Sequence, residues 1–168
     1  MANPIPLPTQ QELHELFDYS VITGELYWKK KTSVRTPAGV TAGYTNTKGY
    51  KVVKINYRSF KVSRLIWVWV TGEDPGSALI DHVDGDKSWN AWHNLRLATS
   101  KQNARNRKKV KGYYYKPQQS QVNPWHVYIG VDSKSCYIGS FKTEAEAAAA
   151  YKKASLKYHG EFSRYSNE

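Results

Sequence analysis

The sequence predicts an α+β fold built from two small units, and three observations lead to this prediction. Short runs rich in β-branched and aromatic residues recur along the chain and are separated by turn residues. Three Thr-x-x-Glu/Gln patterns, at 9–12, 99–102 and 143–146, are capping boxes that mark helix starts. After Lys116 the pattern changes to three β-rich runs and one alanine-rich helix, which indicates a second small core.

The first half of the chain is expected to be β-rich and to contain two short helices. With 168 residues, 40% of them hydrophobic, and six tryptophans, the chain has the apolar side chains for a well-packed core. The first expected element is a helix opened at 9–12 with Leu13, Leu16 and Phe17 inward, followed by a turn at Thr23 and Gly24 and a strand at 26–29. An irregular loop at 31–48 and a β-hairpin turning at 56–59 come next. The last is a buried helix with Ser63 as N-cap and Gly72 as C′ residue.

The second half begins with the order strand, loop, strand, helix. The runs "ALIDHV" and "NLRLAT" are predicted strands, and the capping box at 99–102 starts a helix that continues into a basic segment. Further on, "YYY", "WHVYIGV" and "CYIGSF" are predicted strands, and a helix over 144–158 is ended by Gly160. The predicted boundary lies near 109–112, giving one domain at 1–109 and a second at 110–168.

Charge is unevenly distributed along this basic chain, whose formal net charge is +11. Residues 1–100 carry 12 Lys and Arg against 9 Asp and Glu, whereas residues 101–168 carry 13 against 5. The segment 101–116 has no acid and seven basic residues, which are Lys101, Arg105, Arg107, Lys108, Lys109, Lys111 and Lys116. Such a segment attracts a phosphate backbone and gains affinity from counterion release, although a solvated linker is the plainer alternative. We therefore expect contact with nucleic acid.

Several protein classes are excluded by the composition. The single cysteine, Cys136, rules out a disulfide framework and a cysteine-based zinc site, and it fits a reducing compartment. No apolar run approaches the ~20 residues of a membrane-spanning helix. The start "MANPIPLPTQ" lacks the features of a secretory signal. We expect a soluble, intracellular protein without a membrane partner.

Aspartate, histidine and asparagine residues gather between residues 80 and 106. Asp81 and His82 end a short predicted strand, where an oriented histidine can act as general base on water. The adjacent carboxylate can hold a divalent cation together with an amide oxygen from Asn103 or Asn106 on the following helix. Taken singly, each has a plain structural explanation: a turn acid, a half-buried histidine and solvated helix residues. The combination favours a catalytic site.

The run "RLIWVWVTGEDPGSALIDHVDGDKSWNAWHNLRLATSKQNARNRK" resembles the HNH nuclease family, specifically its homing type encoded by phages and introns. The resemblance extends over about residues 18–108. The residues that carry it at the expected spacing are Asp81, His82, Gly85, Asp86, Lys87, Asn90, Asn94, Leu95, Arg96 and Asn103. It implies a ββα-metal (His-Me finger) nuclease core at about 78–108, preceded by an N-terminal β-rich extension.

This resemblance also implies roles for individual residues. His82 would be the general base that activates the attacking water, and Asp81 and Asn103 would be the ligands of one Mg²⁺ or Mn²⁺ ion. Asn94 would tie the loop between the strands and so keep the His82 ring oriented. A histidine usual in the family is replaced here by Ser63.

Three further positions follow from the same comparison. Arg96 is expected to contact a phosphate or the transition state, and Arg64 and Lys87 are expected to contact DNA. His93 is expected to point away from Asn94 because side chains alternate along a strand. Trp89 and Trp92 are expected to pack the loop.

The run "KGYYYKPQQSQVNPWHVYIGVDSKSCYIGSFKTEAEAAAAYKKASLKYHGEFSRYSN" resembles an AP2-type DNA-binding domain. Its matches include Gly112, Trp125, Val127, Ile129, Ile138, Gly139, Phe141, Thr143, Glu146, Ala147, Ala148, Tyr151 and Gly160. The resemblance implies a three-stranded antiparallel sheet on one helix, reading the major groove, although the usual strand arginines are absent. The residues expected to contact DNA from 105 onward are Arg105, Arg107, Lys108, Lys109, Lys111, Tyr115, Lys116, His126, Tyr128, Lys134 and Tyr137.

Together these observations predict a metal-dependent endonuclease that acts on double-stranded DNA. One such site cuts one strand at a time, so a monomer would nick and a DNA-dependent dimer would cut both strands. The resemblance places the protein in the cytoplasm of a bacterial host, encoded by a phage or mobile element. The alternatives are a non-catalytic DNA-binding regulator that uses an HNH-like fold, and an RNA-binding module.

Overall fold

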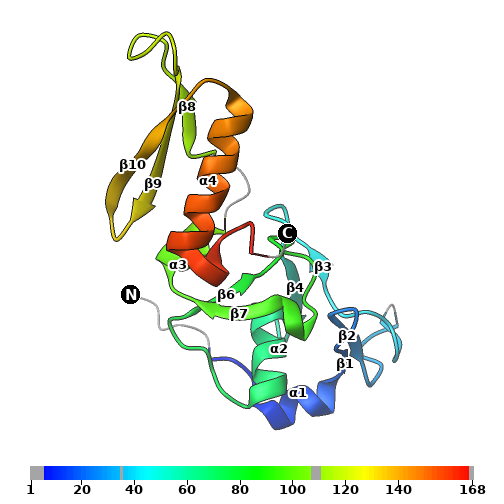
Figure 1. Cartoon of the computed structure of the whole chain (residues 1–168). Helices are drawn as coiled ribbons and strands as arrows, with labels where there is room; N and C mark the ends of the chain where they lie inside the picture. Colours follow the sequence, from blue (N-terminus) through cyan, green and yellow to red (C-terminus); the bar gives the residue numbers. More distant parts are fainter. Residues whose placement is uncertain (1–5, 35, 107–110, 167–168) are drawn as a thin grey trace. The chain divides into compact units, whose positions relative to one another are not determined.

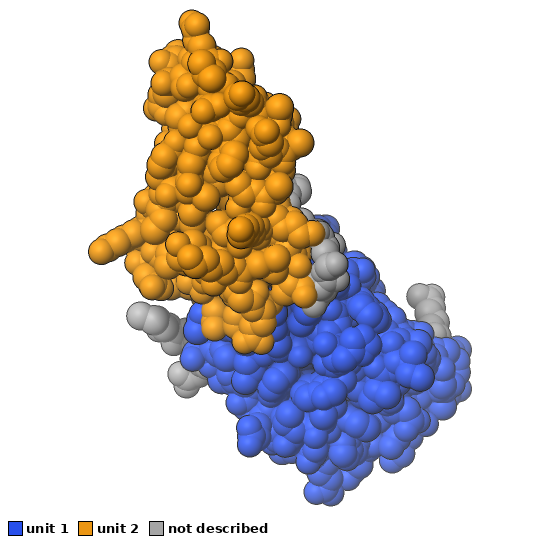
Figure 2. Space-filling model, viewed as in Figure 1, with its two compact units in different colours: residues 1–99 blue, residues 100–168 orange. Residues whose placement is uncertain are grey.

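A computed structural model describes residues 6–34, 36–106 and 111–166. The chain divides into two compact units, residues 1–99 and 100–168 (Figures 1 and 2). This division falls about ten residues before the predicted boundary, which stays a prediction, and it groups the helix after residue 99 with the second unit. The predicted DNA contacts Arg107, Lys108 and Lys109 lie outside the described residues. Within the described ranges, no helix has the length and apolar character needed to cross a membrane.

The first unit opens with helix α1 (Gln10–Leu16) and a two-stranded sheet of β1 (Phe17–Ser20) and β2 (Glu25–Trp28). The predicted capping box is confirmed: Thr9 Oγ1 accepts from the Glu12 N–H at 3.3 Å, and Glu12 Oε2 accepts from the Thr9 N–H at 2.7 Å. Strand β2 confirms the predicted strand. Strand β1 was not predicted: Phe17 was expected on the helix, and an alternation over only four residues is too short to indicate a strand.

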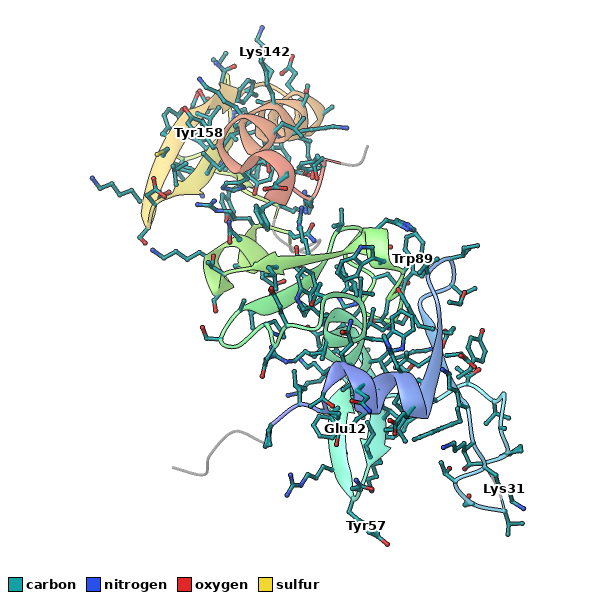
Figure 3. All side chains as sticks on the ribbon, turned by 90° about the horizontal axis from the view of Figure 1, so that it is seen from below. Glu12, Lys31, Tyr57, Trp89, Lys142 and Tyr158 are labelled. Atoms are coloured by element: carbon teal, nitrogen blue, oxygen red, sulfur yellow. The ribbon has the colours of Figure 1, made fainter. Side chains whose placement is uncertain are left out.

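The second sheet of this unit contains the predicted hairpin. Strands β3 (Tyr44–Thr45), β4 (Lys51–Ile55) and β5 (Arg58–Lys61) pair antiparallel in that order. Asn56 and Tyr57 form the turn with φ of 49° and 63°, a conformation that matches the twist of the strands. Tyr57 projects from the tip of the hairpin into solvent (Figure 3).

Helix α2 (Val62–Thr71) follows β5 without a linker. The prediction of Ser63 as N-cap is wrong: Lys61 occupies that position without a side-chain cap, and Ser63 is buried inside the helix. The helix starts two residues earlier than predicted because Val62 packs in the core with Leu65. Gly72 ends the helix at φ 76°, as predicted.

The order strand, loop, strand, helix is confirmed in the centre of the chain. Strand β6 (Leu79–His82) pairs antiparallel with β7 (Leu95–Ala98), and helix α3 (Ser100–Arg105) follows. The loop between the strands ends in a 3-10 turn, η1 (Trp92–Asn94). The expectation that His93 lies on a strand is therefore wrong: the residue sits in η1, is exposed, and stacks edge-on against Trp89 at 5.0 Å.

A mainly apolar core joins α1, α2 and the first two sheets. Helices α1 and α2 lie side by side (Figure 1). The completely buried side chains at its centre are Leu13, Phe17, Leu26, Val53, Val62, Leu65 and Ile66. Burying a side chain of this size contributes about 1.5–3 kcal/mol. This core fixes the base on which β6 and the following loop lie.

The second unit contains the predicted three strands and helix. Strands β8 (Tyr113–Tyr115), β9 (Trp125–Val131) and β10 (Lys134–Phe141) form an antiparallel sheet with β9 in the middle. Helix α4 (Glu144–His159), opened by the Thr143 capping box, covers one face of this sheet (Figure 1), and a short 3-10 turn, η2 (Gly160–Phe162), follows it. The covered face carries Val127 and Ile129 against Ala147 and Ala154.

Candidate active site

Asp81 and His82 are the last two residues of β6, and both side chains are almost completely withdrawn from solvent, at 4% and 3% exposure. Successive strand residues point to opposite faces, so the Asp81 carboxylate and the His82 imidazole have different neighbours. Across the strand pair, Asp81 lies opposite Arg96 and His82 opposite Leu95. A buried charge and a buried imidazole at one strand end require specific partners.

The partner of Asp81 within this sheet is Arg96. Asp81 Oδ2 accepts from Arg96 Nε at 3.0 Å and from Arg96 Nη2 at 2.8 Å. Both side chains are largely buried, at 5% and 14% side-chain exposure. The guanidinium offsets the carboxylate charge and fixes its orientation. Arg96, expected from sequence to meet a phosphate, is thus placed on the carboxylate.

The partner of the His82 ring is Asn90, at 3.0 Å between His82 Nε2 and Asn90 Oδ1. Asn90 Nδ2 donates to the Ser88 carbonyl at 3.0 Å, which fixes the amide so that its oxygen faces the ring. Because an amide oxygen only accepts, Nε2 carries the hydrogen, and the neutral imidazole has its lone pair on Nδ1. The ring is held in the tautomer that can accept a proton at Nδ1.

The pKa of His82 is lowered from its ordinary value of 6.5 because burial disfavours the charged imidazolium. The hydrogen bond that the ring donates to Asn90 and the negative charges of Asp81, Asp84 and Asp86 act in the opposite direction and are outweighed. The ring is therefore neutral at neutral pH. A neutral, oriented imidazole can accept a proton, and the three carboxylates stabilise the cation that results.

Asn94 ties the loop between β6 and β7 together. Its Oδ1 accepts from the Asp84 N–H at 3.0 Å, while its Nδ2 donates to Asp84 Oδ1 at 3.0 Å and to the Trp89 carbonyl at 2.8 Å. The contact with the His82 ring comes from Asn90, four residues earlier. Sequence reasoning missed this division because both asparagines lie in the same polar loop and local spacing does not distinguish them.

The hairpin formed by β1 and β2, here called the N-terminal hairpin, contacts the loop backbone at Asn90 and Ala91. The Tyr19 hydroxyl donates to the Asn90 carbonyl at 2.9 Å, and burial raises the pKa of that hydroxyl to about 12. Gly24, at φ 75°, lies so close to the loop that a Cβ there would stand 2.2 Å from the Ala91 nitrogen. The sequence carries no signal for either contact, because the paired segments are 71 residues apart in the case of Tyr19.

Arg64 and Lys87, the other predicted DNA contacts of the first unit, have different surroundings. Arg64 bonds Asp74 Oδ1 at 3.1 Å and the carbonyls of Gly76 and Ala78 at 3.0 Å each, and so holds the segment that leads into β6. Lys87 is exposed, and its Nζ lies 4.9 Å from the centroid of the Tyr50 ring. Only Lys87 of this pair presents its charge to solvent.

Asn103 lies in α3, in the second unit, and is partly buried. The predicted pairing of its amide with Asp81 thus joins residues of two units and stays a prediction. Among the described residues, no three His, Cys, Asp or Glu side chains come together in a way that would hold a metal ion. Two further predicted contacts pair with acids: Arg105 with Asp132 at 3.8 Å and Lys111 with Glu144 at 3.3 Å.

The predicted DNA-binding residues of the sheet divide between its two faces. On the face away from α4, the Tyr128 and Tyr137 rings lie 5.2 Å apart, His126 and Tyr137 6.0 Å apart, and Lys116 Nζ 4.7 Å from the Tyr128 centroid. His126 is buried among these rings, and its Nε2 has no hydrogen-bond partner in the part of the chain described. Tyr115 instead stacks on Trp125, on the other side. Lys134 is exposed at the start of β10.

Two comparisons with known proteins gave matches, one over most of the chain and one over its central segment. A solved structure described as "DNA binding and cleavage by the HNH homing endonuclease I-HmuI" is 21% identical, with a TM-score of 0.43 over 91% of this chain and 82% of that one. No curated protein matches the chain. Residues 60–105 match the family model of HNH endonucleases, and this range contains Asp81, His82, Asn90, Asn94 and Arg96. The segment 60–105, which carries the candidate site, is therefore similar to HNH endonucleases.

Proposed function

We propose that the chain is a divalent-metal-dependent DNA endonuclease in which His82 is the general base. The observation that carries the proposal is the buried His82 ring, which Asn90 holds by Nε2 and which directly follows the buried Asp81 in strand β6. The match to the HNH endonuclease family covers all of these residues. Hydrolysis of a phosphodiester needs a base for water and charge stabilisation at the phosphate, and this segment offers residues for both.

His82 would take a proton from the attacking water at Nδ1. Burial keeps the ring neutral before the step, and the carboxylates of Asp81, Asp84 and Asp86 stabilise the imidazolium after it. Asn90 holds the opposite nitrogen, so that the ring does not turn as its charge changes. Asn94 acts indirectly, because its side chain bonds Asp84 and Trp89 across the loop that carries Asn90.

Asp81 and Asn103 are the residues we propose to hold Mg²⁺ or Mn²⁺. Carboxylate and amide oxygens are the ligands that these cations prefer, and the Asp81 carboxylate is desolvated and oriented by Arg96. When bound, the cation would polarise the scissile phosphate and stabilise the leaving oxygen. With α3 contributing Asn103, the segment would form a ββα-metal core.

The sheet of the second unit is the surface we propose for double-stranded DNA, in an AP2-like manner. Its face away from α4 carries Lys116, His126, Tyr128 and Tyr137, a combination of aromatic and basic groups that suits nucleic acid. Tyr137→Ala should weaken duplex binding, whereas Tyr158→Ala, an exposed tyrosine on α4, should not (Figure 3). Equal effects of the two variants would remove the sheet face from the proposal.

The experiment that tests the nuclease itself uses supercoiled plasmid with Mg²⁺ or Mn²⁺, EDTA controls and the His82→Ala variant. We expect nicked or linear products from the wild-type chain only, with metal present. If wild type and His82→Ala leave identical products in every metal, the catalytic proposal is wrong and a DNA-binding regulator is favoured. The sequence resemblance further proposes a homing-type enzyme of a phage or mobile element, working in the bacterial cytoplasm as a monomer or DNA-dependent dimer.

A further inference from the structure

Two lysine ammonium groups lie over the Tyr50 ring in the first unit. Lys61 Nζ lies 4.2 Å and Lys87 Nζ 4.9 Å from the ring centroid, both within the range of a cation–π interaction. Lys87 Nζ also approaches the Lys48 carbonyl at 3.4 Å. We call Lys48, Tyr50, Lys61 and Lys87 the Tyr50 cluster. It brings together the segment before β4, the end of β5 and the loop after β6.

The cationic groups of this cluster repel one another. The pKa of Lys61 is lowered because its ammonium group is partly withdrawn from water and lies near the positive charges of Arg64, Lys48 and Lys87. Across residues 6–34, 36–106 and 111–166, no carboxylate forms an ion pair with any of the cluster's three lysines, although neighbouring cations have such partners: Lys51 pairs with Glu25 and Arg64 with Asp74. The cluster concentrates positive charge that the described side chains leave uncompensated.

The cluster adjoins the candidate base. The Tyr50 and His82 ring centroids are 6.3 Å apart, so the ring that contacts Lys61 and Lys87 also adjoins the imidazole. All of these residues belong to the first unit. A strand whose phosphate is attacked at His82 therefore has a concentration of ammonium groups within reach of its neighbouring backbone.

We propose that Lys61 and Lys87, ordered over the Tyr50 ring, bind a backbone phosphate of the DNA strand that reaches His82, with the charge of nearby Lys48 adding to the attraction. This site rests on the proposed nuclease function and adds to it a phosphate subsite next to the base. An anion there would relieve the repulsion among the lysines, and ammonium groups bind phosphate as point charges without reading the base sequence. Tyr50 is a positioning residue that holds the lysines in place.

The test compares Lys61→Gln and Lys87→Gln with Lys54→Gln. Lys54 is an exposed lysine of β4, so its variant loses the same charge without touching the cluster. Binding of an uncleaved duplex is measured by fluorescence anisotropy in EDTA over a range of NaCl concentrations. We expect each cluster variant to lower the slope of log affinity against log salt by about 0.9 and Lys54→Gln to leave it unchanged. Equal slopes for all three variants would overturn the proposal and indicate an ordinary solvated surface.

The role of Tyr50 is tested by Tyr50→Phe and Tyr50→Leu. Tyr50→Phe keeps the aromatic face and should retain the wild-type slope of log affinity against log salt, whereas Tyr50→Leu should lower that slope. Thermal unfolding is expected to show that both variants fold. Cleavage by the same proteins separates this proposal from the nuclease proposal. If the cluster variants change the salt slope but the wild-type protein does not cleave DNA, the nuclease proposal alone is wrong. If the wild-type protein cleaves DNA but the cluster variants leave the salt slope unchanged, the phosphate-subsite proposal alone is wrong.

Discussion

At the scale of single residues, the chemistry of the site depends on how two neighbouring side chains are desolvated. Asp81 and His82 are equally buried, but Arg96 offsets the charge of the carboxylate, whereas an uncharged amide holds the imidazole. The acid therefore has a charged partner in the folded state and the histidine a neutral one. A base that is neutral and a carboxylate that is charged are the states a hydrolytic site needs.

The His82 ring is expected to titrate below pH 6.5 in the metal-free protein, because burial lowers its pKa. The unfolded chain then binds more protons than the folded one as the pH falls below about 6.5, so this group's contribution to stability declines there. An NMR titration in EDTA, with His82→Gln to assign the signal, measures the pKa, and urea unfolding against pH measures the stability. Titration at or above 6.5 would contradict the expected desolvation.

Asn90→Ala is expected to lower the cleavage rate by roughly 10–100-fold, the usual cost of losing a group that orients an active histidine. The ring would lose the acceptor for its Nε2–H, and with it the preference for a lone pair on Nδ1. DNA affinity should be unchanged, because Asn90 is buried and contacts protein only within the described chain. A variant that binds more weakly but cleaves normally at saturation would show that Asn90 has a different role.

At the scale of elements, the N-terminal hairpin is a support for the catalytic loop. The turn between β1 and β2 packs against the backbone of residues 90 and 91, and strand β1 contributes the Tyr19 bond to the Asn90 carbonyl. The β-rich extension thus does more than lengthen the fold: it fixes the loop that orients His82.

Gly24→Ala should destabilise the protein more than Gly39→Ala and should also slow cleavage. Both glycines have positive φ, 75° and 80°, but a Cβ at Gly39 meets nothing within 4 Å, whereas one at Gly24 meets the loop backbone. Gly39→Ala therefore measures the backbone strain alone, about 1–2 kcal/mol. Urea unfolding and cleavage rates of the two variants isolate the effect of the clash. Equal losses of stability and of cleavage rate in the two variants would mean that the loop moves to accommodate the added Cβ without cost.

At the scale of the whole molecule, two units divide the work that we propose. The first unit carries the candidate base, its orienting asparagines and the Tyr50 cluster. The second carries Asn103, the sheet with its aromatic face, and most of the excess positive charge. Binding affinity and bond cleavage are therefore expected to respond differently to changes in each unit.

Deletion of residues 110–168 should weaken duplex binding and reduce its salt dependence, because 8 Lys and Arg are removed with 5 Asp and Glu. On saturating DNA the truncated chain, which retains Asn103, should lose less in cleavage than in affinity. Anisotropy titrations at several salt concentrations and single-turnover cleavage provide the two measurements. Unchanged binding by the truncated chain would mean that the second unit is not the source of affinity.

Local chemistry made much of the fold predictable. Capping boxes at Thr9 and Thr143, the two-residue hairpin at Asn56 and Tyr57, and Gly72 at the helix end depend on neighbours within four residues, and the structure has each of them. The start of α2 was missed because core packing of Val62 outweighed the capping preference of Ser63. His93 was misplaced because a 3-10 turn has no strong sequence signature.

The sequence by itself determined the order of helices and strands, the position of the Asp81–His82 site, the excess of positive charge after residue 100 and the match to a nuclease motif. All of these depend on residue types and their local spacing. Only the tertiary structure decided which groups meet: Asn90 with His82, Tyr19 with Asn90, and Lys61 and Lys87 with Tyr50. These contacts join segments whose separation in sequence is arbitrary. Their specificity comes from packing of the hairpin, the helices and the loop around one core, which no short pattern records.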